Sequence, residues 1–254
     1  DSTGADRMGI LPELIDRDRY NEDGVGGMHM YTPWWKDNKK LDFARGYHIE
    51  YWGGMGQPAY GAGGGMDSLR KYLKDEFGNP SPNGGYGAGL KKDIRRIYGS
   101  TLGMSGRGES IPQHSNYCEI DPNMVDTYGI PVLRFHYKWT DQEIKQAKHM
   151  QDTFEEILTQ AGATLLGSKP GPESMYGLAG PGRIIHEVGT TRMSNDPKSG
   201  VVSSNCQVHA CKNLFVVDAG PFVSQADKNP TWTILALSWR TSDYIIEQLK
   251  QKNI

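Results

Sequence analysis

Apolar and polar positions alternate most regularly over residues 132–139. Strict alternation places every second side chain on the same side of a strand, and that side carries Leu133, Phe135, Tyr137 and Trp139. Residues 140–143 follow with a Thr-x-x-Glu capping box, after which helical apolar spacing runs to about Ala161 and stops at Gly162. The pattern predicts a strand followed directly by a helix.

The first half of the chain shows shorter patterns that glycine interrupts. Residues 1–40 indicate turns between short strands, because Gly and Asp separate the apolar clusters there. The aromatic-rich segment 47–52 predicts a strand with polar and aromatic groups on opposite faces. Helical spacing favours a helix over 66–73, inside a glycine-dense stretch, and a short basic helix over 90–98.

The C-terminal end combines one strand pattern and one helix pattern. Residues 213–217 predict a strand, residues 218–228 a loop, and the segment from Pro230 to about Lys250 a helix. Strands and helices are expected along the whole chain without a repeat period. The pattern therefore predicts an α+β fold.

Composition narrows the classes of function. A chain of 254 residues with 37% apolar residues and 32 glycines is typical of a loop-rich globular protein. The formal net charge of −2 gives no electrostatic surface for nucleic acid or for an anionic membrane. No apolar run approaches the roughly 20 residues of a membrane span. Polyanion binding and membrane insertion are therefore not expected.

The cysteines and the first residues leave the compartment open. Cys118, Cys206 and Cys211 form an odd, scattered set, so a disulfide framework is not expected. The segment beginning at Asp1 has neither an initiator Met nor the character of a signal peptide. We expect the chain to begin within a longer protein, and periplasm and cytoplasm are both consistent with the sequence.

Two C-terminal motifs carry the candidate chemistry: the run His186-Glu-Val-Gly-Thr-Thr-Arg-Met193 and the triplet Asn229-Pro230-Thr231. Asn is a favoured N-cap and Pro a favoured first helical residue, so the amides after Pro230 point outward at the positive end of a helix. Oxidation of an alcohol requires removal of its hydroxyl proton, for which imidazole is suited near neutral pH. His186 is the candidate base, and the Asn229 side chain is a candidate partner for the same hydroxyl.

The helix start also suits a flavin. A reduced flavin concentrates negative charge on one edge, and a helix N-terminus favours such charge by up to about 2 kcal/mol. The plain structural alternative is a core histidine and an ordinary helix cap, and that alternative is favoured for either motif alone. The two motifs together favour a hydride-transfer site.

At these residues the chain resembles the C-terminal part of a glucose-methanol-choline (GMC) FAD oxidoreductase. The resemblance covers about residues 180–254 and is carried by His186, Gly189-Thr190, Arg192-Met193, the run 213–219 and Asn229-Pro230-Thr231. The chain has a His and an Asn at these positions instead of two His. In this it resembles the sugar-oxidising branch of the family, which includes pyranose 2-oxidase and glucoside 3-dehydrogenases.

The resemblance implies both roles and organisation. It implies His186 as catalytic base, Asn229 as hydroxyl partner, Asp218 and Ala219 at the flavin ribityl or pyrophosphate, and Asn229, Pro230 and Thr231 beside the flavin ring. It further implies an antiparallel sheet backed by helices in a substrate-binding domain, residues 1–180. Residues 181–254 then contribute a strand and a helix to a Rossmann-like FAD domain.

One departure concerns the other half of the cofactor site. The Gly-x-Gly-x-x-Gly turn that holds the ADP half of FAD in this family is absent, since residues 85–89 lack its spacing and context. No segment for covalent flavin attachment is evident. We expect another part or chain to supply the dinucleotide half.

Weaker motifs favour structural readings. Cys206, His209 and Cys211 lack a fourth ligand and alternate in direction, so no metal site is expected. Residues 103–107 are similar to a nucleophile elbow, but no preceding strand is expected and a flexible turn is favoured. Arg192 is expected to bond backbone carbonyls.

Five further residues suit a polyol because they combine aromatic faces with polar groups: His48, Tyr51, Trp52, Gln113 and His114. Each of them taken singly is favoured as structural or exposed. They are candidate residues of a sugar pocket.

The sequence leaves several hypotheses open. The first is an FAD-dependent dehydrogenase or oxidase that converts a sugar or glycoside hydroxyl to a ketone. The alternative is a cofactor-free carbohydrate-binding or interaction module derived from this fold. The substrate, the oxidised carbon and the electron acceptor stay undetermined, with O2, a quinone and a cytochrome subunit all compatible.

Overall fold

The computed structural model describes residues 3–17, 30–33, 40–53, 74, 77, 79–80, 87–183 and 186–254. The chain forms two compact units. The sheet unit comprises Gly4–Arg107 and Ile144–Leu178, and the hairpin unit comprises Asp1–Thr3, Gly108–Glu143 and Ala179–Ile254. The assignment of residues 1–180 and 181–254 to a substrate domain and an FAD domain stays a prediction.

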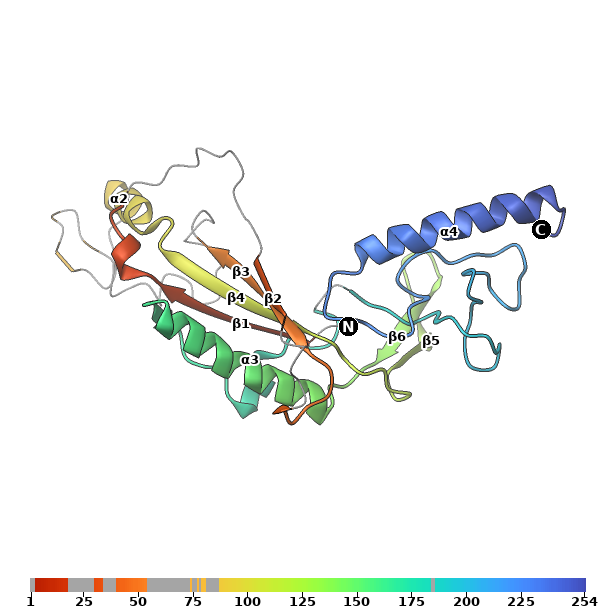
Figure 1. Ribbon diagram of the computed structural model, residues 1–254, viewed down its shortest axis with the longest axis horizontal. Coiled ribbons are helices and arrows are strands. Elements are labelled where there is room, and N and C mark those ends of the chain that lie inside the picture. Colours follow the sequence, from red (N-terminus) through yellow and green to blue (C-terminus); the bar gives the residue numbers. More distant parts are fainter. Residues whose placement is uncertain are drawn as a thin grey trace. The chain divides into compact units, whose positions relative to one another are not determined.

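The sheet unit contains a five-stranded sheet with the order β2-β3-β4-β1-β7. Its strands are β1 (Thr3–Ile10), β2 (Met30–Pro33), β3 (Tyr47–Gly53), β4 (Thr101–Gly108) and β7 (Thr164–Leu166) (Figure 1). β2 and β3 pair antiparallel, as do β1 and β7. The antiparallel sheet and the strand predicted over 47–52 are confirmed. The turn predicted over 103–107 is wrong, because these residues lie in the middle of β4.

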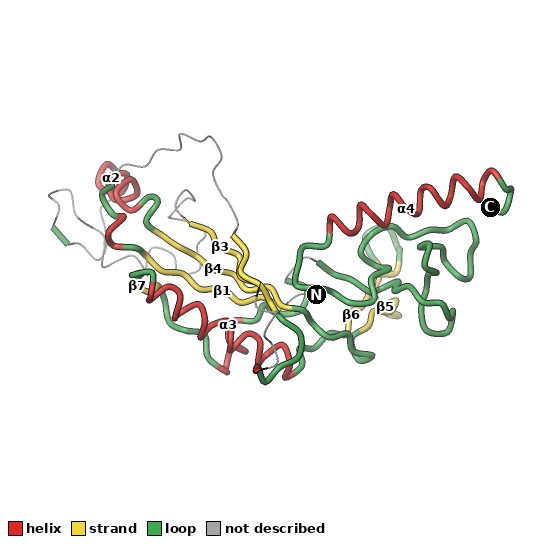
Figure 2. The backbone as a smooth tube through the Cα atoms, viewed as in Figure 1, coloured by secondary structure: helices red, strands yellow, loops and turns green. Residues whose placement is uncertain are grey.

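Helix α3 (Asp141–Gln160) covers one face of this sheet (Figure 2). A Cβ atom added at Gly106 of β4 would lie 2.4 Å from the Met150 sulfur, and one at Gly9 of β1 would lie 3.3 Å from Leu158. Met150, Phe154 and Leu158 are fully buried. The small glycines thus allow the helix to approach the strands closely.

The start of α3 has the predicted capping box. The Thr140 backbone N–H donates to Glu143 Oε2 at 2.8 Å, and the Gln142 N–H donates to Thr140 Oγ1 at 3.3 Å. Gly162 follows the helix with a φ of 79°, a conformation that glycine adopts without a steric penalty. The helix predicted before Gly162 is confirmed at both ends.

Helix α2 (Ala88–Ile97) packs on the opposite face of the sheet at one end. Ile97 forms a small buried cluster with Ile10 and Leu166, and Met8 packs against it. The short 3-10 helix η1 (Pro12–Leu14) follows β1. The predicted basic helix is confirmed, whereas the helix predicted over 66–73 lies outside the described residues.

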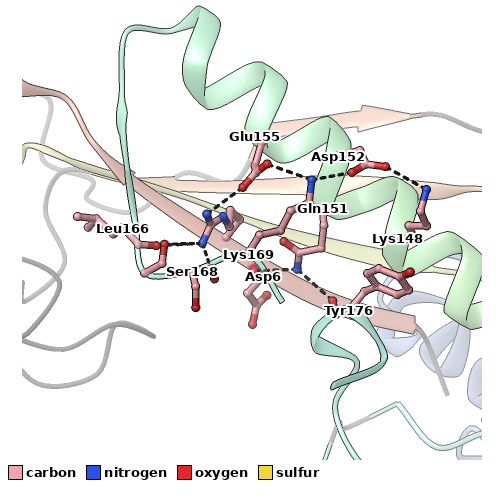
Figure 3. Close-up of polar contacts among 11 residues, drawn as sticks. Asp6, Lys148, Gln151, Asp152, Glu155, Leu166, Ser168, Lys169 and Tyr176 are labelled. Carbon is pink, nitrogen blue, oxygen red and sulfur yellow. Dashed lines mark hydrogen bonds and ion pairs between the residues drawn. The ribbon is translucent and has the colours of Figure 1, made fainter. Parts of the chain in front are cut away.

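A polar network ties β1, α3 and the segment after β7 together (Figure 3). The buried Arg7 guanidinium donates to Glu155 Oε1 at 2.9 Å. It also donates to three carbonyl oxygens, those of Leu166 at 3.1 Å, Gly167 at 3.2 Å and Ser168 at 2.9 Å. Lys169 bridges Glu155 and Asp152 at 3.0 and 2.6 Å.

This network predicts acid sensitivity of the sheet unit. Burial favours the neutral carboxyls, but hydrogen bonds and charge from Lys169 outweigh it, so the pKa values of Asp152 and Glu155 lie below their ordinary range. A lowered folded-state pKa gives stabilisation that is complete above the unfolded-state values of about 4 and is lost as the pH falls through the folded values. As the pH falls below about 4, we expect the free energy of unfolding of Lys169→Met to decrease less than that of the unaltered protein. Urea unfolding at a series of pH values checks this, and parallel curves for both proteins would contradict it.

The hairpin unit contains β5 (Tyr117–Val125) and β6 (Pro131–His136), which pair antiparallel with Ile120 opposite Leu133. The strand predicted over 132–139 therefore ends three residues early. Trp139 lies beyond the strand, and its indole N–H donates to the Ala179 carbonyl at 2.9 Å.

Helix α4 (Thr231–Lys250) packs on the loops of the hairpin unit. The buried Thr241 hydroxyl donates to the Asn205 carbonyl at 3.4 Å, and the Tyr244 hydroxyl donates to Gln207 Oε1 at 3.3 Å. The strand predicted over 213–217 is wrong, since only a single bridge joins Phe215 to Gln207. A strand requires a continuous neighbour, which this segment lacks within the described residues.

The helix predicted from Pro230 is confirmed, but it begins one residue later, at Thr231. Among the described helices, none combines the length and the apolar character needed to cross a membrane.

Candidate active site

The motif that begins at His186 lies beside the loop that begins at Asp218. Three backbone hydrogen bonds join them: Gly189 N–H to Ala219 O at 3.3 Å, Thr191 N–H to Gly220 O at 3.1 Å, and Met193 N–H to Pro221 O at 2.9 Å. Two groups of predicted site residues, separated by about thirty positions, thus form one local structure.

Gly220 lies close to the Thr191 side chain of the His186 motif. A Cβ atom there would lie 2.3 Å from Thr191 Oγ1 and 2.9 Å from Asp218 Oδ1. The Gly220 N–H donates to Asp218 Oδ1 at 2.7 Å, which holds the carboxylate in a tight turn. The Thr191 hydroxyl is buried and has no hydrogen-bond partner among the described residues. A side chain at position 220 would collide with Thr191, so glycine is required where these two segments meet.

His186 has an unusual backbone conformation. Its φ is 98°, in the region that L-residues other than glycine rarely adopt, and its side chain is half-buried. Such a conformation costs about 1–3 kcal/mol and persists only where the surroundings impose it. A conformation of this kind at a predicted catalytic residue supports a functional role.

The loop before Asn229 is held by a residue that the sequence did not single out. Gln225 is 2% exposed and donates from Nε2 to the Lys228 carbonyl at 3.1 Å, while its buried Oε1 has no hydrogen-bond partner within the part of the chain that the structure describes. Lys228 also pairs with Asp227 at 2.6 Å. Gln225 therefore fixes the backbone directly before Asn229, although no sequence signal distinguishes it from the polar residues around it.

The start of α4 differs from the prediction in a way that bears on Asn229. Pro230 is the N-cap and no side chain caps the helix. The first backbone hydrogen bond of the helix runs from the Ile234 N–H to the Pro230 carbonyl at 3.0 Å. The amides of residues 231–233 therefore have no acceptor within the helix. The prediction that Asn229 caps the helix is wrong, and its exposed side chain is not used in capping.

Other predicted residues have local roles. Arg192 Nε donates to the Ser199 carbonyl at 2.8 Å, which confirms its expected bond to backbone. His209 Nε2 lies 3.0 Å from the Ser194 carbonyl, and the Cys211 thiol donates to Asn213 Oδ1 at 3.1 Å. Cys206 is buried. Within the described ranges, no group of three or more His, Cys, Asp or Glu side chains is placed to hold a metal ion.

The five predicted sugar-pocket residues lie in different places. His48 and Trp52 share one face of β3, whereas alternation places Tyr51 on the other face. Gln113 and His114 are exposed in the hairpin unit.

The comparisons with known proteins identify the family of the chain. Residues 112–238, half of the 254-residue chain, match the family model described as GMC oxidoreductase. The chain belongs to the GMC oxidoreductase family, in which FAD is the cofactor.

Curated relatives include several enzymes of sugars and sugar acids. Gluconate 2-dehydrogenase flavoprotein from Pantoea cypripedii is 28% identical over 69% of this chain and 29% of the relative. C-glycoside 3-oxidase from Arthrobacter globiformis is 29% identical over 63% of this chain and 30% of the relative. The chain thus spans less than a third of the length of these relatives.

A solved structure supports the fold. A formate oxidase variant from Aspergillus oryzae superimposes with a TM-score of 0.60 at 14% identity, over 100% of this chain and 47% of that chain. At this identity the likeness concerns the fold alone.

The described residues fit a flavin. The buried Thr191 hydroxyl and the uncapped amides of residues 231–233 are polar groups suited to an anionic or hydrogen-bonding cofactor. Asp218 and Ala219 shape the turn at Gly220.

Proposed function

We propose that this chain provides the substrate-facing part of an FAD-dependent oxidoreductase that oxidises a sugar or glycoside hydroxyl to a ketone. One observation carries the proposal: the backbone of the His186 motif is hydrogen-bonded to the loop from Asp218 to Pro221. This pairing assembles a candidate base and a candidate cofactor turn in one unit.

When bound, FAD accepts the hydride that leaves the substrate carbon. His186 takes the hydroxyl proton on an imidazole nitrogen, so the oxygen can form the carbonyl as the carbon–hydrogen bond breaks. Asn229 donates from its side-chain amide to the same oxygen and holds it toward the base. The amides at the start of α4 and the turn at Gly220 would hold the cofactor.

Relatives support the substrate class. Pyranose 2-oxidase from Tricholoma matsutake is 28% identical over 51% of this chain and 22% of the relative. Together with the C-glycoside 3-oxidase, it favours a pyranose ring as the substrate.

An exposed apolar stripe on α4 supports the proposal that another part of the protein, or another chain, packs against this helix. Five large apolar side chains recur at helical spacing and are more than half exposed: Trp232, Leu235, Trp239, Ile246 and Leu249. Exposed apolar stripes of this size usually mark interfaces. We assign this stripe to the part or chain that supplies the dinucleotide-binding half, since this chain spans only a fraction of its relatives' length.

The visible absorption spectrum of the natively purified protein tests the proposal. We expect a flavin spectrum that bleaches when a methyl glycoside is added without oxygen. A colourless, folded protein that binds the glycoside would instead support a cofactor-free carbohydrate-binding module. A flavin spectrum that no sugar bleaches would contradict sugar oxidation.

A further inference from the structure

Asn229 lies in an exposed bend between two buried residues of the hairpin unit. Gln225 is 2% exposed and Pro230 is buried, whereas Ala226, Lys228 and Asn229 between them are exposed. The two ends of the bend are thus held in the interior, and the Asn229 side chain faces outward. Its direction depends on what fixes the backbone of the bend.

The side chain of Gln225 closes this bend. Its Nε2 donates to the Lys228 carbonyl at 3.1 Å, so the bond connects a residue with the carbonyl three positions later. A peptide unit is planar, and the plane that contains the Lys228 carbonyl also contains the N and Cα atoms of Asn229. A bond that fixes this carbonyl therefore also fixes the position and direction of Asn229.

The start of the same loop is attached to the His186 motif. The Met193 N–H donates to the Pro221 carbonyl at 2.9 Å. The backbone path from that motif to Asn229 therefore runs through Pro221 and then through the bend that Gln225 closes. A change at Gln225 acts on Asn229 and leaves the bond at Pro221 in place.

The stability of the fold does not explain a glutamine at this position. The Gln225 Oε1 is buried and has no hydrogen-bond partner among the residues that the structure describes. A buried acceptor without a partner destabilises a fold, and an apolar side chain of the same shape avoids this cost. The Lys228 carbonyl belongs to an exposed residue and can bond to water instead. The bond that Gln225 donates is therefore better explained by the geometry it imposes than by stabilisation.

We propose that Gln225 is a positioning residue for the reaction: by fixing the peptide between Lys228 and Asn229, it holds the Asn229 amide toward the substrate hydroxyl. Gln225 acts through Asn229 and not on the substrate itself. A misplacement of about 1 Å can slow a reaction by about a hundredfold, so one such bond is sufficient to affect the rate. The inference rests on the proposed function, in which Asn229 bonds to the hydroxyl.

Gln225→Met tests the proposal in the complete flavin-loaded protein. Methionine has a similar length, cannot donate to the Lys228 carbonyl and removes the unpaired buried acceptor. We expect the limiting rate of flavin reduction by methyl β-glucoside without oxygen to fall roughly tenfold. The urea concentration at the midpoint of unfolding should stay the same or rise. A lower midpoint together with the slower rate would mark Gln225 as a structural residue and overturn the inference.

Native-state proteolysis measures the bend without any reaction. Trypsin cleaves after lysine, and the carbonyl that it attacks at Lys228 is the one that accepts from Gln225. Cleavage under native conditions requires local mobility of the backbone. We expect trypsin to cleave Gln225→Met after Lys228 several-fold faster than the unaltered protein, with the fragments identified by mass. Equal cleavage rates would show that Gln225 does not hold the bend and would overturn the inference.

Gln207→Met is the matched control. Gln207 lies in the same unit, and its Nε2 donates to the Lys212 carbonyl at 2.6 Å, so the change removes the same kind of bond at another loop. Gln207 also accepts from the Tyr244 hydroxyl, so this variant is expected to lose some stability. It should change neither the limiting rate of flavin reduction nor the cleavage after Lys228.

A double-mutant cycle with Asn229→Ala shows whether Gln225 acts through Asn229. We expect Gln225→Met to slow the unaltered protein but to have no further effect on Asn229→Ala. An equal effect in both backgrounds, or reduction of Gln225→Met at the original rate, would overturn the inference while sugar oxidation stands. If the glucoside did not reduce the flavin of the unaltered protein, the proposed function and the positioning role would both be refuted.

Discussion

The His186→Ala variant is expected to reduce its flavin with sugar roughly a hundredfold or more slowly than the unaltered protein. A positioned base typically contributes that much to a step in which a proton leaves as the hydride is transferred. Stopped-flow measurement of flavin reduction without oxygen reports this step directly. The flavin itself should stay bound, because the groups assigned to it belong to Gly220, Thr191 and the start of α4.

The backbone of His186 provides a matched control. Its φ of 98° is strained for alanine but not for glycine. His186→Gly should therefore unfold at a higher denaturant concentration than His186→Ala, while both lose the rate. Added imidazole should partly restore reduction in the glycine variant, since it leaves space for the base. Reduction at the original rate in both variants would remove His186 from the catalytic role.

Local sequence signals predicted those elements whose partners are close in the chain. The capping box at Thr140 and Glu143 is complete within four residues, so the start of α3 could be recognised without its environment. Residues 103–107 show the opposite case. Their two glycines suggested a turn, yet Gly103 and Gly106 are small because Trp52 and Met150 lie over them. Packing across the sheet, which no local pattern reveals, decided their conformation.

The site was predictable in its motifs but not in its supports. His186 and Asn229 stood out because their types and neighbours suggested chemistry, and their catalytic roles stay predictions. Gly220 and Gln225 were missed, since their importance comes from close approach to Thr191 and from a bond to the Lys228 carbonyl. Both contacts are made by folding rather than by sequence pattern. His48 and Trp52 were predicted only as isolated residues, because β4, whose Gly103 lies under the Trp52 ring, was not predicted as a strand.

A substitution at Arg7 is expected to destabilise the sheet unit strongly. Arg7→Met removes the donor to Glu155 and to three carbonyl oxygens, including those of Leu166 and Ser168. Removing one partner of a buried ion pair typically costs 3–5 kcal/mol, and we expect about 3 kcal/mol here because Glu155 keeps Lys169 as a second partner. Urea unfolding at neutral pH measures the loss.

Two further variants show whether burial causes this effect. Lys169→Met also removes a positive charge that pairs with Glu155. Because the lysine side chain is 34% exposed, its loss should lower the free energy of unfolding by less than about 1 kcal/mol. Glu155→Gln combined with Arg7→Met should destabilise by less than the two single changes together, because both break one interaction. If Arg7→Met and Lys169→Met proved equally mild, the guanidinium would be dispensable, and β1 and the segment after β7 would be held by packing alone.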